Sequence, residues 1–409
     1  MIRWFFLVAL FVLIEYYSFQ AFRTVFRSRW VPWGILALTT AVYIYIIYQF
    51  SQFDRSVGQN RTSLITAGLL LITLIPKLVI VLVLFIEDVY RLPAGLVHLI
   101  NHREATDHIP SRRKFVSTVA LGLAAVPLIS LLYGMFKGKY DFRVIRQPVY
   151  FDDLPDEFDG FTITQISDIH SGSFDNREKI EYAVDLINQQ QSDLIVFTGD
   201  IVNTHAREMY PWIETFNRIE NPRHGKFSIL GNHDYGEYLE WKSQQQKAAN
   251  FEAIKDLHRQ IGFRLLLNEN VRITKGDSSI ALVGVENWGH NFKKAGDLAL
   301  ASEGIAQTDF KVLLSHDPSH WEYEVKRHPG NFHLTLSGHT HGMQFGIEIP
   351  GVVKWSPVQY VYKQWAGLYE ELGRYIYVNR GLGFHAYPGR VGIWPEITVL
   401  ELKKRLKNA

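Results

Sequence analysis

The sequence predicts a layered α/β domain that follows a four-helix transmembrane region. Two observations carry this prediction. The first 136 residues hold four apolar stretches, each about as long as a helix needs to be to cross a membrane. From about residue 147, short β-rich runs alternate with longer amphipathic segments, a pattern typical of a sheet with helical crossovers. We expect the transmembrane region at residues 1–140, the α/β domain at 147–403 and a solvated tail at 404–409.

Each apolar stretch is long enough to cross a bilayer, because a helix of about 20 residues covers roughly 30 Å. Buried core helices of a soluble domain are the alternative. Four such runs within 136 residues exceed what soluble helices show. Trp33 and several flanking tyrosines also suit the interfacial belt of a membrane protein. The expected spans are 4–22, 31–50, 63–86 and 115–136.

Two charged side chains interrupt the expected spans. Glu15 lies in the first span, and Lys77 follows Pro76 in the third. Intramembrane charges are functional candidates by default, because their transfer into hydrocarbon is costly. We favour the simpler interpretation that Glu15 and Lys77 pair with each other or line the interior of the helix bundle.

Basic residues predict the orientation, because loops rich in Lys and Arg stay in the cytoplasm. The loops after the first and third spans are the more basic, so both termini are expected outside. The stretch SRRKFVSTVALG, residues 111–122, resembles a twin-arginine export signal, with an ordinary basic helix flank as the alternative. We therefore expect an integral protein of the bacterial cytoplasmic membrane with an extracytoplasmic α/β domain. The basic residues are Arg23, Arg27 and Arg29 after the first span, Arg55 and Arg61 after the second, and Arg91, Arg103, Arg112, Arg113 and Lys114 after the third. Four basic residues after the fourth span argue mildly against this orientation: Lys137, Lys139, Arg143 and Arg146.

Composition excludes several classes of function. The formal net charge is only +2, so the basic surplus of a nucleic-acid binder is missing and no nucleic-acid partner is expected. The chain has no cysteine, which excludes disulfides, thiolate metal sites and cysteine nucleophiles.

The α/β domain is predicted from apolar runs of strand length that alternate with helical patterns. The expected helices are 177–191 and 240–261. The expected strands are 161–166, 194–198, 226–230, 280–285, 311–314, 333–336 and 375–378.

Five of these strands are followed by residue types that bind metals. Sites in α/β sheets form where the carboxyl ends of strands converge, so we expect one common site. Two aspartates, one asparagine and four histidines suit ions such as Mn, Fe, Co or Zn. Seven ligands are too many for one such ion with an open position, and they suit two ions that share a carboxylate, with Asp200 as the natural bridge. The seven residues are Asp168, His170, Asp200, Asn232, His316, His339 and His341.

The chemistry of such a pair of ions favours phosphate esters. Two aspartates and a bridging hydroxide leave a residual positive charge on the centre, which stabilises a phosphate and its more negative transition state. A structural metal or satisfied buried histidines are the alternative. Structural sites, however, are usually closed and four-coordinate.

The ordered motifs D-x-H, G-D, G-N-H-D, H and G-H-x-H resemble those of the calcineurin-like metallophosphoesterases. They run from Asp168 to His341, about half of the chain. VNRGLG, residues 378–383, and PEITVLEL further resemble the membrane-associated bacterial branch of that family. Met343 departs from this branch, which usually has glycine there. The resemblance implies a metallophosphoesterase-type layered β-sandwich flanked by helices.

The resemblance also implies residue roles. His233 would lie near the leaving group, with Asp234 holding its ring. A first metal would be held by Asp168, His170, Asp200 and His341, and a second by Asp200, Asn232, His316 and His339.

The expected function is hydrolysis of a phosphoester by in-line attack of a hydroxide that bridges two divalent ions. The membrane anchor favours lipid-linked or envelope substrates. A catalytically inactive sensor or binding module on a membrane unit is the alternative, and a transporter or channel with a regulatory α/β part is a third. His385 and Arg390 are candidates for binding phosphate, although Arg390 could instead pair with a carboxylate. Seven other histidines are expected at the surface or in packing: His205, His224, His258, His290, His320, His328 and His333.

Overall fold

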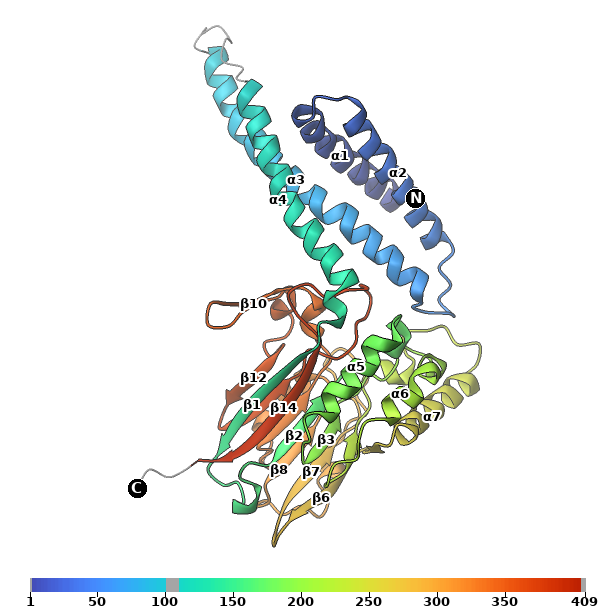
Figure 1. Cartoon of the computed structure of the whole chain (residues 1–409), viewed down its shortest axis with the longest axis vertical. Coiled ribbons are helices and arrows are strands. Elements are labelled where there is room, and N and C mark those ends of the chain that lie inside the picture. Colours follow the sequence, from blue (N-terminus) through green and yellow to red (C-terminus); the bar gives the residue numbers. More distant parts are fainter. Residues whose placement is uncertain (1, 101–109, 406–409) are drawn as a thin grey trace. The chain divides into compact units, whose positions relative to one another are not determined.

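The computed structural model describes residues 2–100 and 110–405, with side chains described for residues 9–91 and 112–405 (Figure 1). The chain forms two compact units. The helical unit comprises residues 1–53 and 65–135. The α/β unit comprises residues 54–64 and 136–409.

The helical unit consists of long helices at the positions of the four expected spans. These are α1 (Ile2–Val25), α2 (Trp30–Ser51), α3 (Arg61–Ile100) and α4 (Pro110–Phe136). Three segments of the described residues are long and apolar enough to cross a membrane: Trp30–Ser51, Arg61–Arg91 and Arg112–Phe136. At the start of α1, residues 2–8 lie outside the described side chains.

Two sets of ion pairs link the helices. The Lys77 ammonium contacts the Glu15 carboxylate, which confirms the expected pairing of these two charges. Arg113 of α4 lies 2.8 Å from Glu87 and 2.7 Å from Asp88 of α3. These pairs stabilise α3 where it continues to Ile100, beyond the expected end of the span at residue 86. The polar segment after residue 86 is therefore largely helix rather than loop, while Arg103 lies outside the described residues.

The α/β unit contains two six-stranded sheets and a separate two-stranded hairpin. The hairpin pairs β10 (Ile347–Ile349) with β11 (Val353–Trp355). The first sheet has the order β1 (Arg143–Phe151), β14 (Glu396–Lys404), β2 (Thr162–Ile166), β3 (Leu194–Phe197), β4 (Lys226–Ser228) and β5 (Arg264–Leu265). The second has the order β12 (Gly367–Glu371), β13 (Arg374–Val378), β9 (Leu334–Ser337), β8 (Lys311–Leu314), β7 (Ser278–Gly284) and β6 (Glu269–Lys275).

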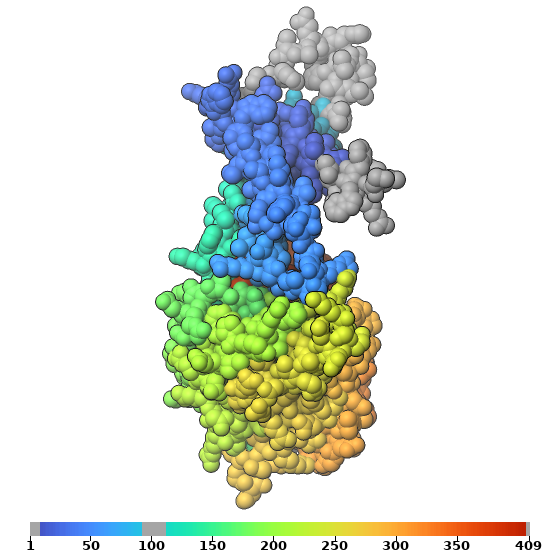
Figure 2. All heavy atoms as spheres, turned by 90° about the vertical axis from the view of Figure 1, so that its right-hand side faces the viewer, coloured from blue at the N-terminus to red at the C-terminus, as the bar shows by residue number. Residues whose placement is uncertain are grey.

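The sheets pack face to face, and helices cover their outer faces. Ile163 and Val196 of the first sheet share a buried cluster with Leu336 of the second. The opposite face of β3, with Phe197, packs under α5 (Arg177–Asn188), α6 (Ile213–Asn217) and α7 (Gln244–Gln260). These helices form much of the surface in Figure 2, where they are green to yellow. Trp321, in α9 (Pro318–Tyr323), shares a buried cluster with β7 and β13 of the second sheet. Strands covered on both faces are apolar throughout, which explains runs such as the LIVF of β3.

The layered α/β sandwich expected from the sequence is thus confirmed, with a strand in each of the seven expected runs. The structure adds β1, β5, β6, β10, β11, β12 and β14. The first strand begins at Arg143, before residue 147, and β14 continues to Lys404, while residues 406–409 of the expected tail lie outside the described residues.

Candidate metal centre

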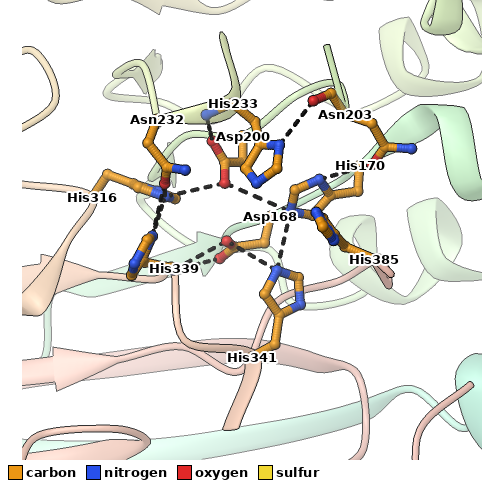
Figure 3. A network of polar contacts seen from close by, with 12 residues as sticks. Asp168, His170, Asp200, Asn203, Asn232, His233, His316, His339, His341 and His385 are labelled. Carbon is orange, nitrogen blue, oxygen red and sulfur yellow. Dashed lines mark hydrogen bonds and ion pairs between the residues drawn. The ribbon is translucent and has the colours of Figure 1, made fainter. Parts of the chain in front are cut away.

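Parallel strands bring the seven candidate ligands to one edge of the sandwich. β2, β3 and β4 run parallel in the first sheet, and β8 and β9 run parallel in the second. Each of these strands is followed at its carboxyl end by a candidate ligand, so the side chains converge (Figure 3). Six of the seven residues are buried, and the side chain of His339 is 9% exposed. The sequence argument that strand ends should meet is therefore supported by the geometry.

The backbone at these strand ends is unusual. Five of the seven candidate ligands have positive φ, in the left-handed region that non-glycine residues rarely adopt. Such conformations cost about 1–3 kcal/mol each and cluster at functional sites. The φ values are 50° for Asp168, 47° for His170, 62° for Asp200, 74° for His339 and 50° for His341.

Glycines allow the strand ends to approach each other closely. A Cβ on Gly338 would lie 2.2 Å from Oδ2 of Asp168, and a Cβ on Gly231 would lie 2.2 Å from Oδ1 of Asp200. Both distances are far inside van der Waals contact. Glycine is thus required before each of these ligand loops, because a side chain there would collide with a carboxylate.

Asp168, His170 and His341 form one ligand group. Their donor atoms all lie within 4.8 Å of one another. His341 Nε2 is 3.3 Å from Asp168 Oδ1 and 3.0 Å from His170 Nε2. Nitrogen and carboxylate donors that converge in this way are typical of a site for a first-row divalent cation.

Asp200, His316 and His339 form a second group, whose donor atoms also lie within 4.8 Å of one another. His316 Nε2 lies 3.2 Å from Asp200 Oδ2. The Asn232 side-chain oxygen lies 3.1 Å from His316 Nε2 and 2.7 Å from His339 Nδ1. Asn232 therefore belongs with this group as an oxygen donor.

Asp200 connects the two groups. Its Oδ2 is 3.6 Å from His170 Nε2, besides being 3.2 Å from His316 Nε2. Asp200 also forms a third group with His170 and His233. A carboxylate within reach of ligands from both groups is the arrangement that two neighbouring cations require, so the donor set fits divalent metal ions.

Electrostatics favours the protonation state of a metal ligand at Asp168, Asp200 and His170, but not at His316. Burial raises the pKa of Asp168 and Asp200, but neighbouring histidines outweigh burial and hold both pKa values below their usual range. Burial, followed by the charge of His385, holds the pKa of His170 well below its ordinary value. Burial also lowers the pKa of His316, but the charge of Asp200 raises it to about 10. Metal binding at His316 therefore requires the release of a proton.

Outer hydrogen bonds orient the histidine rings. Nδ1 of His170 lies 3.0 Å from the Asn203 side-chain oxygen, and Nδ1 of His316 lies 2.7 Å from the Thr198 carbonyl oxygen. A proton on each Nδ1 makes these hydrogen bonds and leaves Nε2 free to bind a cation, as in most histidine metal ligands. Sequence reasoning missed Asn203, although its position three residues after Asp200 offered a signal.

The structure corrects the expected role of Asp234. Its carboxylate accepts hydrogen bonds from the backbone N–H groups of Asp200, Ile201 and Gly231, at 2.8–3.0 Å. The ring of His233 is held instead at Nδ1, 2.8 Å from the carbonyl oxygen of Asn203. Asp234 thus fixes the strand-end backbone, and the expectation that it holds the His233 ring is wrong, because the Asn203 carbonyl holds that ring.

His385 and Arg390 lie beside the first group. The ring centre of His385 is 5.0 Å from that of His170 and 4.5 Å from that of His233. Arg390 is fully buried and donates to the carbonyl oxygens of Gly381 and Gly383, with Nη2 also 3.2 Å from His341 Nδ1. These partners contradict the alternative that Arg390 pairs with a carboxylate.

The loop of residues 54–64 also contacts segments near the site. The Gln59 side-chain oxygen accepts from the backbone N–H of Ala386 at 3.1 Å, next to His385. Its amide nitrogen lies 3.4 Å from Ser173 Oγ. No local sequence pattern predicts this contact, because the partners are more than a hundred residues apart.

Other histidines support packing. His258 is buried, lies 2.9 Å from Ser228 Oγ and stacks on Phe197. His320 is also buried, with Nδ1 2.8 Å from Ser315 Oγ.

Comparisons with known proteins agree with the motifs. A family model described as probable calcineurin-like phosphoesterase, transmembrane domain, matches residues 2–139. A model described as calcineurin-like phosphoesterase matches residues 161–343. The two matches cover the helical region and the ligand-bearing strands.

Several curated proteins are similar over most of the chain. The uncharacterized metallophosphoesterase YkuE of Bacillus subtilis is 31% identical over 299 residues, which cover 72% of this chain and 98% of that protein. A transmembrane protein with metallophosphoesterase domain from Danio rerio is 25% identical over 340 residues, which cover 80% of this chain and 72% of that protein. An uncharacterized metallophosphoesterase of Helicobacter pylori strain J99 is 27% identical over 304 residues, covering 73% and 74%.

Proposed function

Since this chain belongs to the calcineurin-like phosphoesterase family, we propose that it is a membrane-anchored hydrolase of phosphoesters that works with two divalent metal ions. The observation that carries the proposal is the pair of ligand groups that share Asp200. One carboxylate within reach of both groups supports a dinuclear centre over a single closed site.

The proposed ligands follow the two groups. The first ion would be held by Asp168, His170, Asp200 and His341. The second would be held by Asp200, Asn232, His316 and His339. When bound, such ions supply Lewis acidity that activates water and neutralises the charge of phosphoryl oxygens.

The chain's own contribution to bond cleavage is assigned to His233. The Asn203 carbonyl accepts from Nδ1–H and so fixes the ring, which leaves Nε2 to exchange a proton. In its imidazolium form, His233 would donate that proton to the departing oxygen of the substrate. His385, whose ring lies against His233, is proposed to contact the phosphoryl group from the same side. Arg390 is proposed to act on the phosphate only indirectly, by positioning His341.

Metal content and hydrolysis test this proposal together. Full-length protein in detergent is stripped with a chelator, reloaded with manganese and assayed with bis(p-nitrophenyl) phosphate. Asp200→Ala is expected to lose metal by elemental analysis, because both groups lose their shared carboxylate. His233→Ala is expected to keep metal and lose about a hundredfold or more in turnover.

A matched control guards against general damage. His224 lies just before β4, at the edge opposite the site, so His224→Ala should leave both readouts unchanged. Undiminished turnover in His233→Ala would remove this residue from the mechanism. A wild-type protein that binds manganese and hydrolyses no phosphoester would favour the inactive sensor or binding module instead.

We further propose that the helices span the bacterial cytoplasmic membrane and that the α/β unit lies outside the cytoplasm. The charge counts of the loops support this orientation. The number of crossings is supported separately, because residues 54–64, after the second expected span, belong to the same unit as residues 136–409, after the fourth. Two crossings separate the segments, so both lie on one side. A C-terminal alkaline phosphatase fusion should be active, and an inactive fusion beside an active cytoplasmic reporter would reverse the assignment.

A further inference from the structure

The β10–β11 hairpin and the turn after it expose an unusual number of large apolar side chains. Val352 at the tip of the hairpin and Tyr360 in the following turn are each 79% exposed. Contiguous exposed apolar patches of this kind mark interaction surfaces, while single exposed apolar residues need no explanation. We call this patch the 347–361 surface and define it by Ile347, Ile349, Val352, Val353, Tyr360 and Val361.

This surface is tied to the loops that carry the metal ligands. The hairpin follows His341 in the chain, and Ser356 Oγ donates to the carbonyl oxygen of Gly342 at 2.7 Å. Beyond the turn, the Tyr362 hydroxyl lies 2.8 Å from His339 Nε2. The 347–361 surface is therefore joined at both ends to the candidate metal centre.

The chain enters the α/β unit at the same edge. β1 begins at Arg143 opposite Glu396, the first residue of β14, and β14 runs antiparallel to β2. The start of β1 therefore lies at the carboxyl end of β2, where the candidate metal centre is. A cavity of about 660 Å³ lies between the first residues of β1 and the hairpin, lined by Arg143–Ile145, residues 348–354 and Arg380.

Packing within the α/β unit also links the residues that follow α4 with the hairpin. α4 ends at Phe136, and a Cβ on Gly138 would lie only 2.5 Å from the carbonyl oxygen of Arg390. The next carbonyl, of Val391, accepts the N–H of Gly346 at the base of the hairpin, at 2.9 Å. The first residues of the α/β unit are thus packed against the segment that holds the base of the hairpin.

Lysines lie within and beside this surface. Lys354 in the hairpin and Lys363 after the turn are exposed, and Lys363 pairs with Glu322 at 3.0 Å. The acidic Glu348 lies 2.6 Å from Arg380, which also pairs with the buried Glu396. Apolar side chains flanked by lysines bind the boundary between headgroups and acyl chains, with added attraction to anionic lipids.

We propose that the 347–361 surface inserts into the headgroup region of the bilayer that the chain spans, so that the metal centre acts on phosphoesters carried by membrane amphiphiles. This inference rests on the proposed hydrolase function. It names the substrate class as a phosphoester with a lipid tail, whose headgroup reaches the centre without leaving the bilayer.

Site-directed labelling tests the insertion independently of activity. The chain has no cysteine, so Val352→Cys provides a unique attachment point for an environment-sensitive fluorophore in the full chain. The control is Leu372→Cys, which is 64% exposed at the β12–β13 turn, at the amino end of β13 and hence at the opposite edge. Both proteins are reconstituted into vesicles of phosphatidylcholine and phosphatidylglycerol, with and without brominated acyl chains.

Quenching by brominated lipid at position 352 but not at 372 is the expected result. Equal quenching at the two positions, or none at either, overturns the proposal. A disulfide between two copies through Val352→Cys, without quenching, also overturns it and assigns the surface to a second copy of this chain.

Hydrolysis then separates this proposal from the function on which it rests. Val352→Asp and Leu372→Asp are compared on hexadecyl p-nitrophenyl phosphate in the same vesicles and on the water-soluble ethyl ester. Val352→Asp should lose about tenfold on the hexadecyl ester only, and Leu372→Asp should lose nothing on either. Equal rates for Val352→Asp and wild type on both esters refute the lipid proposal and leave the hydrolase intact. No hydrolysis of either ester by wild-type protein refutes the proposed function itself.

Discussion

Replacing Asn203 by alanine is expected to weaken metal binding at the group of Asp168, His170 and His341. The side-chain oxygen of Asn203 lies 3.0 Å from His170 Nδ1, so it accepts the proton that leaves Nε2 free for the cation. The contact to His233 comes from the Asn203 backbone carbonyl and persists in the variant. The substitution therefore removes the hydrogen bond to the candidate ligand His170 and keeps the one to the proposed proton donor His233.

The magnitude follows from the burial of this hydrogen bond. His170 is 1% exposed, so an Nδ1–H without its acceptor loses a buried hydrogen bond that water cannot readily replace. Such a loss costs about 1–3 kcal/mol. With 1.4 kcal/mol for each factor of ten, manganese should bind about 10–100-fold more weakly. Turnover at saturating manganese should stay within a few-fold of wild type, because His233 is still held.

The assay is a manganese titration of hydrolysis beside isothermal calorimetry on stripped protein. Asn203→Asp is the conservative variant and should bind manganese at least as well, because a carboxylate also accepts from Nδ1–H. Asn250→Ala is the matched control, since Asn250 holds Thr204 and Ala206 of the same loop without contacting His170. Unchanged manganese affinity in Asn203→Ala, or an equal loss in Asn250→Ala, would refute the reasoning.

Three further predictions concern the surroundings of the site. Gly338→Ala should lower metal content and melting temperature, because its Cβ would lie 2.2 Å from Asp168 Oδ2; full metal content would contradict this. Gln59→Ala should speed hydrogen exchange at the Ala386 amide, and unchanged exchange would show that Gln59 does not hold it. Burial raises the pKa of Glu208 from 4.5 to about 7 despite opposing backbone N–H groups, so the folded chain holds this proton more tightly than the unfolded chain does. Stability should therefore fall as pH rises from 4.5 through 7, by at most about 3 kcal/mol. Melting curves of Glu208→Gln should show a smaller decline than wild type, and parallel curves would contradict it.

The ligand-bearing strands could be predicted because they are short, apolar on both faces and followed by polar residues. β3 and β9 are buried along their whole length, so composition alone marks them. β1 and β6 have mixed burial, and their polar residues hide the strand pattern. β14 is mostly buried, yet it pairs with β1 and β2 from the far end of the chain, which no local pattern reveals.

The supporting contacts of the site were harder to predict. The Nδ1 partners of His233 and His316 are backbone carbonyl oxygens, which carry no sequence signature. The partner of His339 Nε2 is the Tyr362 hydroxyl, which comes from a turn after an unpredicted hairpin. Ligand types can thus be inferred from the sequence, whereas the groups that orient them depend on how distant loops meet.

A carboxylate held in common has a thermodynamic consequence. Asp200 is within reach of both ligand groups, so a cation that settles in one group changes the position and charge seen by the next. In the proposed dinuclear centre, loading would then be cooperative, and by reciprocity each ion would alter the affinity for the other by the same factor. The manganese binding isotherm should therefore differ from that of two independent sites. The cooperativity is positive if ordering of the shared carboxylate outweighs repulsion between the ions, and negative if repulsion is the larger effect.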